Sequence, residues 1–167
     1  MMSTLETYQE SFAFNRTRTL ALLDSISEME SPAEVLGWRP GAGRAHIAWQ
    51  LMHIGVTEEL FGVERLVSRP EAARHADLWE RFRGGSTPDD TIPSVDEIRQ
   101  VLSDGRELMS ETLASLSDDQ LETLTWMHPR MQKELSLRTT LQIVGWHEGH
   151  HQGQAHITLN LYRACQT

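Results

Sequence analysis

The sequence predicts an all-α protein, a four-helix bundle in which a long crossover connects the second and third helices. Several segments place apolar residues three and four positions apart, the period of a helix that buries one face. No run with the period of a β-strand reaches a useful length in the 167 residues. One connection, residues 69–93, is far longer than is usual inside a compact domain. We therefore expect a single domain over residues 1–167.

The first predicted helix has the clearest periodicity, with an apolar seam from Leu5 to Met29. Two polar side chains, Asn15 and Thr19, interrupt this seam. Because buried polar groups need partners, these residues either set the register of the helix or face a polar pocket or metal site. We favour the pocket.

The second predicted helix runs from Arg44 to about Ser68 and is apolar around most of its circumference. Before it, Ser31-Pro32-Ala33-Glu34 predicts a capping box that opens a short turn. The crossover from Arg69 to Pro93 surrounds a short helical piece and is long enough to cover a pocket or to span the bundle. A second capping box, Ser94-Val95-Asp96-Glu97, begins the third helix. Residues 126–136 are expected to be irregular or a small hairpin, and the fourth helix begins near Thr139.

A histidine pair in the fourth helix is the most informative feature. His147 and His151 lie four residues apart and so project from one face, which is the spacing of two ligands to one metal ion. The same spacing also suits two half-buried, hydrogen-bonded side chains, and His150 beside them stays open as a ligand. A metal site requires a third histidine from elsewhere in the fold.

His46 and His53 are the candidates for that third ligand. They lie seven residues apart, about 10 Å along a helix axis, so both cannot share one ion with the pair in the fourth helix. His46 follows a Gly-rich break, where we expect exposure, whereas His53 lies within an apolar stretch. Metal sites in bundles are built in the core from facing helices, which favours His53. Gln50 shares its helix face and is a candidate pocket residue.

Composition limits the partners. The formal net charge is -9, which argues against nucleic acid. No apolar run approaches the roughly 20 residues that cross a bilayer, and the N-terminus lacks a signal-peptide pattern, so we expect a cytoplasmic protein. Cys165, the single cysteine, cannot form an internal disulfide, in agreement with a reducing compartment. Five tryptophans and seven methionines in a small bundle favour a homodimer.

Four motifs, taken in order, resemble one known family. They are Phe14-Asn15-Arg16, Trp38-Arg39-Pro40, the segment from Ile47 to Ile54, and His147-Glu148-Gly149-His150-His151-Gln152-Gly153-Gln154. The sequence resembles the DinB-like superfamily of metal-binding four-helix bundles over the whole chain. This resemblance implies an up-down-down-up topology, frequent homodimers, and His53, His147 and His151 as ligands of a divalent ion, zinc or nickel.

The resemblance also implies a class of chemistry. Members with known activity include transferases and isomerases that depend on a low-molecular-weight thiol, and others are described as metal-dependent hydrolases. We expect transfer of a small thiol to an electrophilic small-molecule substrate. Hydrolysis is an alternative, as is a non-catalytic stress-response module whose ion has a fourth protein ligand, Glu148 or His150. The sequence identifies no catalytic acid or base.

Overall fold

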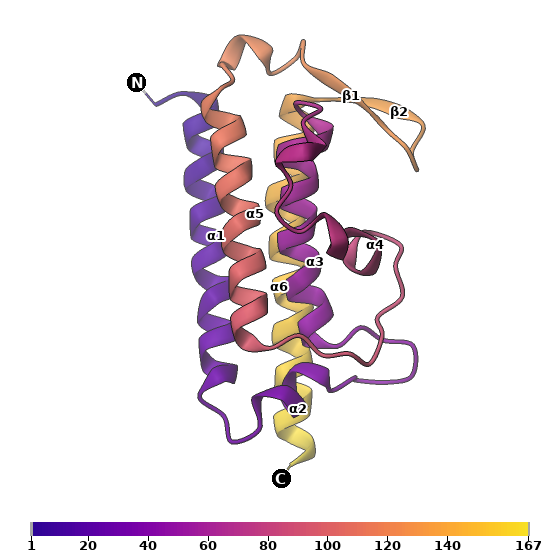
Figure 1. The fold of residues 1–167 in the computed structure, drawn as a ribbon. Coiled ribbons are helices and arrows are strands. Elements are labelled where there is room, and N and C mark those ends of the chain that lie inside the picture. Colours follow the sequence, from indigo (N-terminus) through magenta and orange to yellow (C-terminus); the bar gives the residue numbers. More distant parts are fainter. Residues whose placement is uncertain (1, 167) are drawn as a thin grey trace.

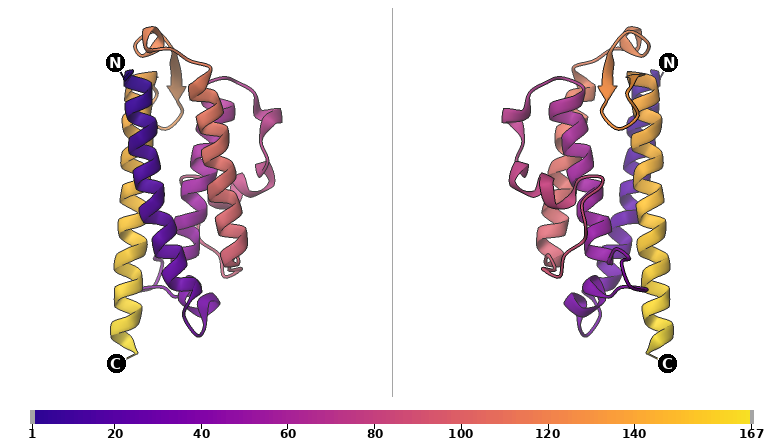
Figure 2. Two further views of the ribbon diagram at one scale, coloured as in Figure 1. Left: turned by 90° about the vertical axis from the view of Figure 1, so that its left-hand side faces the viewer. Right: turned by 90° about the vertical axis from the view of Figure 1, so that its right-hand side faces the viewer.

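Four long helices pack side by side in the computed structural model, which describes residues 2–166 (Figure 1). They are α1 (Thr4–Ser27), α3 (Ile47–Glu59), α5 (Val95–Ala114) and α6 (Leu137–Cys165). In Figure 1, α1 and α6 run downward from their N-termini, whereas α3 and α5 run upward, and Figure 2 shows the same arrangement from two sides. The helix α3 packs mainly against α5 and α6, and α1 packs mainly against α6. The all-α prediction is therefore confirmed in its broad form.

Shorter elements complete the fold. They are the helices α2 (Pro32–Gly37) and α4 (Trp79–Phe82), the π-helical segment η1 (Leu60–Arg65), and the 3-10 turns η2 (Pro70–Ala72), η3 (Ala76–Leu78) and η4 (Asp118–Gln120). The strands β1 (Thr125–His128) and β2 (Lys133–Ser136) form an antiparallel hairpin in which Trp126 pairs with Leu135. The hairpin is thus the correct alternative for residues 126–136. Across residues 2–166, no helix combines the length and apolar character needed to cross a bilayer.

The helix ends confirm some sequence signals and correct others. The Ser94 hydroxyl accepts from the backbone N–H of Glu97, whose carboxylate accepts from the backbone N–H of Ser94, as predicted. The capping box predicted at Ser31 is wrong, because its side chain makes no cap hydrogen bond. The prediction that His46 is exposed is also wrong. This residue is 1% exposed, and its Nδ1 caps α3 by accepting from the backbone N–H of Trp49 at 3.0 Å.

The second helix is shorter than the sequence suggested. Regular α-helix ends at Glu59, and the chain continues as the π-helical η1 to Arg65 rather than as α-helix to Ser68. In a π-helix each N–H bonds one residue further back than in an α-helix, as Leu66 does to the oxygen of Phe61. Apolar periodicity does not distinguish these two windings over six residues.

The core consists of two apolar clusters separated by buried charges. One cluster contains Leu22, Leu102 and Leu159, and the other contains Phe12, Met109 and Leu141. Between them along the four long helices lie four charged residues, one from each helix, which we call the buried ion quartet: Arg16, Glu58, Arg106 and Glu148. Two cations and two carboxylates satisfy each other there, which buried charges require.

The crossover between η1 and α5 is held on the outside of α3 by two buried side chains. The Glu59 carboxylate accepts hydrogen bonds from the backbone N–H of His75 at 3.1 Å and from Nε1 of Trp79 at 3.0 Å. Nε2 of His46 lies 3.0 Å from the backbone oxygen of Asp89. These contacts tie the crossover to both ends of α3, and α4 lies beside α3 in Figure 1.

Candidate metal centre

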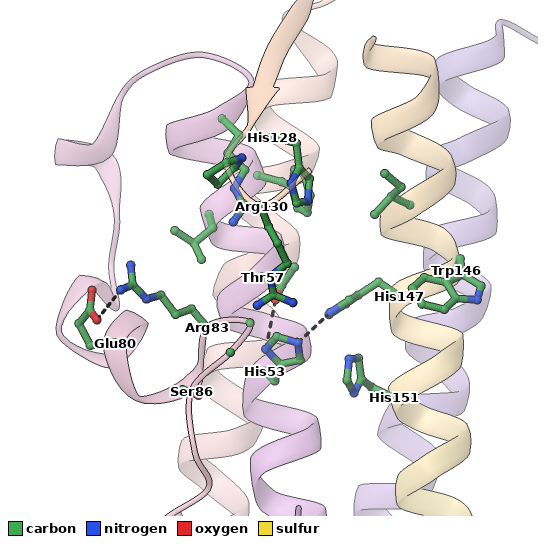
Figure 3. Close-up of a pocket in the computed structure, with 17 residues that line it drawn as sticks. His53, Thr57, Glu80, Arg83, Ser86, His128, Arg130, Trp146, His147 and His151 are labelled. Carbon is green, nitrogen blue, oxygen red and sulfur yellow. Dashed lines mark hydrogen bonds and ion pairs between the residues drawn. The ribbon is translucent and has the colours of Figure 1, made fainter. Parts of the chain in front are cut away.

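Three imidazoles converge from two helices at one point (Figure 3). His53 comes from α3, and His147 and His151 come from successive turns of one face of α6. One ring nitrogen from each lies within 4.8 Å of those from the other two, and Nε2 of His147 lies 2.9 Å from Nε2 of His53. The structure thus brings together the three histidines selected from the sequence.

Hydrogen bonds on the far side orient two of the three rings. Nδ1 of His53 lies 2.5 Å from the backbone oxygen of Phe82, and Nδ1 of His151 contacts Oε1 of Gln50. Because carbonyl oxygens only accept, each Nδ1 carries the proton and the lone pair of each ring is on Nε2. Metal-binding histidines are oriented by partners of this kind. Gln50, predicted as a pocket residue, lies behind His151 and holds its ring.

Burial favours the neutral form of all three histidines. It lowers the pKa of His53 below the ordinary value of 6.5. Burial, followed by the positive charge that His53 and His151 would carry, lowers the pKa of His147 well below 6.5. For His151, burial and then His53 lower the pKa to about 3. Neutral imidazole is the form that binds a metal, so the cluster is ready for an ion at pH 7.

The three nitrogens fit a divalent transition metal. Imidazole suits zinc and nickel, whereas magnesium and calcium prefer oxygen ligands, and the cluster consists of histidines alone. An ion bound tetrahedrally at about 2.0–2.1 Å would separate neighbouring nitrogens by roughly 3.3 Å. The Nε2 atoms of His53 and His147 are 2.9 Å apart. A small outward movement of the rings would therefore accommodate the ion.

The histidines form part of the wall of an open pocket of about 800 Å³ (Figure 3). This volume is within the usual range for small-molecule sites. The crossover contributes Glu80, Arg83 and Ser86 to the lining, and the hairpin contributes His128 and Arg130. The crossover therefore does lie beside the pocket, as its length suggested.

Asn15 and Thr19 lie elsewhere. Nδ2 of Asn15 donates to the backbone oxygen of Gly145 at 3.0 Å, and the Thr19 hydroxyl donates to Oε1 of Glu148 at 2.8 Å. Neither residue is among those that line the pocket. Both connect α1 to α6, which corresponds to the alternative interpretation that they set helix register.

The two residues considered as a fourth ligand are engaged away from the cluster. The Glu148 carboxylate belongs to the buried ion quartet, where it accepts from Arg16 at 2.7 Å and from Arg106 at 2.6 Å. His150 is exposed, its ring stacks on Trp146 with centroids 4.7 Å apart, and its Nε2 lies 2.8 Å from Nε2 of Gln154. Neither residue belongs to the group His53, His147 and His151 that could hold one ion.

Sequence reasoning missed several residues that line the pocket, among them His128 and Arg65. His128 is half-buried and lines the pocket from the hairpin. Arg65 lines it from η1. The proline after His128 signals only a turn, and the location of that turn depends on how the hairpin packs.

A comparison with protein families agrees with this geometry. The model of the DinB superfamily matches residues 11–155, which include both the α3 histidine and the α6 pair. A search of curated proteins finds no significant match. Because this match covers most of its length, the chain belongs to the DinB superfamily.

Proposed function

We propose that this protein binds one divalent ion, zinc or nickel, through His53, His147 and His151 and uses it to transfer a small thiol to an electrophile. The observation that carries the proposal is the convergence of three neutral imidazoles at the wall of an open pocket. Three nitrogen ligands with remaining positions open are typical of catalytic zinc, whereas structural zinc has four protein ligands.

The ion, when bound, would lower the pKa of a thiol or water and so supply a nucleophile at neutral pH. The chain's own residues orient the imidazoles that would hold the ion. Phe82 and Gln50 hold the rings of His53 and His151, and Trp49 stacks on His53 with centroids 4.6 Å apart. The thiol-dependent transferases that the sequence resembles favour a thiol over water as the nucleophile.

Hydrolysis is the second candidate, because water would fit the same place. A non-catalytic binding module is the third, but the engagement of Glu148 and His150 elsewhere favours an open coordination position. All three candidate functions use the same three histidines as metal ligands. They differ in the molecule that occupies the remaining coordination position of the ion.

We also propose a single domain in the up-down-down-up bundle topology, a homodimer and a cytoplasmic location. The opposite directions of α1 and α6 relative to α3 and α5 support the topology (Figure 1). The exposed apolar residues Phe14 on α1 and Trp146, Ile157 and Leu161 on α6 support a dimer. Sedimentation equilibrium at micromolar concentration tests the homodimer. A monomer mass of 19.0 kDa would contradict it.

Metal content is the first test. Protein purified without an affinity tag should contain about one ion per chain, and His147→Ala and His151→Ala should each remove it. His156→Ala is the matched control, because His156 is exposed on the same helix and lies outside the cluster. Metal content that is unchanged in both site variants would reject the proposed centre.

Turnover is the second test. Metal-loaded protein is incubated with bacillithiol, mycothiol, glutathione or no thiol, together with electrophiles and ester or amide substrates, and products are followed by mass spectrometry. We expect metal-dependent thiol adducts. Turnover only without thiol would reject transfer in favour of hydrolysis, and no turnover across a broad panel would favour the binding module.

A further inference from the structure

The pocket has a charge opposite to that of the whole chain. The protein carries a formal net charge of -9. Among the residues that line the pocket, however, three are arginines, Arg65, Arg83 and Arg130, and the one acid is Glu80. Glu80 pairs with Arg83 at 2.7 Å, which leaves two arginines to act on a ligand. A cleft lined by one sign of charge attracts ligands of the other sign.

Arg65 is held in place but lacks an acidic partner. Its guanidinium carbon lies 4.6 Å from the centre of the Phe61 ring and 5.0 Å from that of Trp126. Among residues 2–166, no carboxylate lies within ion-pair distance of it. Burial lowers the pKa of Arg65 more than its neighbour Glu64 raises it. A partly buried cation without a counter-ion costs free energy that an anionic ligand would recover.

The π-helical segment explains why Arg65 reaches the metal centre. In an uninterrupted α-helix Arg65, twelve residues beyond His53, would point about 120° away from it. The wider turns of η1 wind the chain through fewer degrees per residue, so both side chains line one pocket. The charge of Arg65 contributes to lowering the pKa of both His53 and His147, which places it close to the site.

Arg130 lines the pocket from the hairpin. It lies in the turn between β1 and β2, above His53 in Figure 3. Its Nη2 lies so close to Gly85 that a Cβ there would be 2.9 Å from it. Gly85 has a φ of +97°, which favours glycine, so a glycine of the crossover leaves room for this arginine. Arg130 has no hydrogen-bond or ion-pair partner in the described part of the chain.

We propose that the pocket binds small molecules bearing an oxyanion group, carboxylate or phosphonate-like, which Arg65 and Arg130 hold beside the metal centre. The inference names a ligand class for the proposed function and rests on it for the metal. The planar guanidinium fork matches the geometry of both oxyanions. The reacting carbon or sulfur of such a ligand would then be directed toward the three histidines.

Calorimetry on zinc-loaded protein with three probes tests this inference. Phenylacetate, benzylphosphonate and phenylacetamide share a benzyl group and differ in charge and head group. We expect both anions to bind at least about tenfold more tightly than the amide, and the ratio of the two anions identifies the preferred head group. Equal binding of all three probes would overturn the proposal.

Variants assign the preference to the arginines. Arg65→Gln and Arg130→Gln should each reduce the ratio of anion affinity to amide affinity to about threefold or less. Arg65→Lys should keep part of the preference for anions. Arg18→Gln, an exposed arginine of α1 outside the pocket, is the matched control for lost charge. Full anion preference in both glutamine variants, each with native circular dichroism, would overturn the proposal.

The same titrations on chelator-treated protein separate the two proposals. Anion preference that persists without zinc and is lost in Arg65→Gln supports the arginine site. If the preference for anions is lost when zinc is removed, the metal itself binds the acid group, which overturns the role of the arginines. Absence of zinc from the wild-type protein would reject the proposed function alone, because the anion titration is read independently.

Discussion

The Nδ1 atom of His53 lies 2.5 Å from the backbone oxygen of Phe82, so the α3 ligand of the proposed centre is held by the crossover. Phe82 itself is 1% exposed and belongs to the apolar cluster that contains Leu22, Leu102 and Leu159. One residue thus anchors the crossover through its side chain and orients a histidine through its backbone. Packing of the crossover and geometry of the centre are therefore coupled.

Phe82→Ala should weaken both stability and metal binding. Removing a buried phenylalanine side chain costs about 3–5 kcal/mol, and loss of a histidine's orienting partner typically costs 10–100-fold in metal affinity. Urea unfolding and competition with a chromogenic chelator measure the two effects. Met131→Ala, at a methionine that is 55% exposed and does not line the pocket, should change neither. Wild-type zinc affinity in a destabilised Phe82→Ala protein would show that the two are not coupled.

Gln50→Leu should lower zinc affinity about 10–100-fold. Leucine nearly preserves the volume but removes the oxygen that accepts the Nδ1 proton of His151, so the ring loses its fixed orientation. Gln142→Leu, an exposed glutamine on α6, is the control. The same chelator competition measures both variants, and equal affinities would mean that packing alone orients His151.

Arg16→Met should destabilise the protein by about 3–5 kcal/mol, because it leaves Glu58 and Glu148 short of a counter-ion in the core. Arg18→Met removes the same charge from an exposed position two residues away and should stay within about 0.5 kcal/mol of the wild type. Urea unfolding compares the two. A small effect at Arg16 would show that water reaches the quartet.

Metal-free protein should lose stability as the pH falls below about 6.5. The pKa values of His53, His147 and His151 are lower in the folded state than the unfolded value of 6.5. Below that pH the unfolded chain binds protons that the folded chain does not, and for His151 this continues to about pH 3. Each histidine then contributes a slope of up to about 1.4 kcal/mol per pH unit.

Urea unfolding of the metal-free protein at pH 7, 6 and 5 measures this slope. His151→Gln should make it shallower, whereas His156→Gln, at an exposed position, should leave it unchanged. A slope that is the same in wild type and His151→Gln would mean that His151 titrates normally in the folded protein.

Two glycine-to-alanine changes should have opposite signs. A Cβ at Gly105 would lie 2.3 Å from the backbone oxygen of Gly55, so α5 and α3 would have to move apart, at a cost of about 1–3 kcal/mol or more. A Cβ at Gly149 meets nothing within 4 Å, and alanine there should stabilise α6 by about 0.5–1 kcal/mol. Melting temperatures give both signs, and a stable Gly105→Ala protein would show that the helices can separate.

Local patterns predicted a large part of this protein because they report on one helix at a time. The four-residue spacing of His147 and His151 places both rings on one face of α6 whatever surrounds it. The Ser94 capping box likewise depends on neighbours within one turn. The ligand on the second helix required a choice between His46 and His53. The position of His53 in an apolar stretch was sufficient to select it. The interruption of the first seam by Asn15 and Thr19 was visible, but what they contact was not.

By itself, then, the sequence determined the helical class and the pair His147 and His151, because helix periodicity and ligand spacing are short-range properties. The apolar setting of His53 and the DinB resemblance selected the third histidine. Only the tertiary structure decided which ring nitrogens are free to bind a metal. Phe82 of α4 contacts His53 of α3, and Gln50 of α3 contacts His151 of α6, so each partner comes from a different helix. It also decided that Glu58 and Glu148 are neutralised by Arg16 and Arg106 rather than directed at an ion. The position of Arg65 depends on the π-helical winding of η1, which apolar periodicity does not encode.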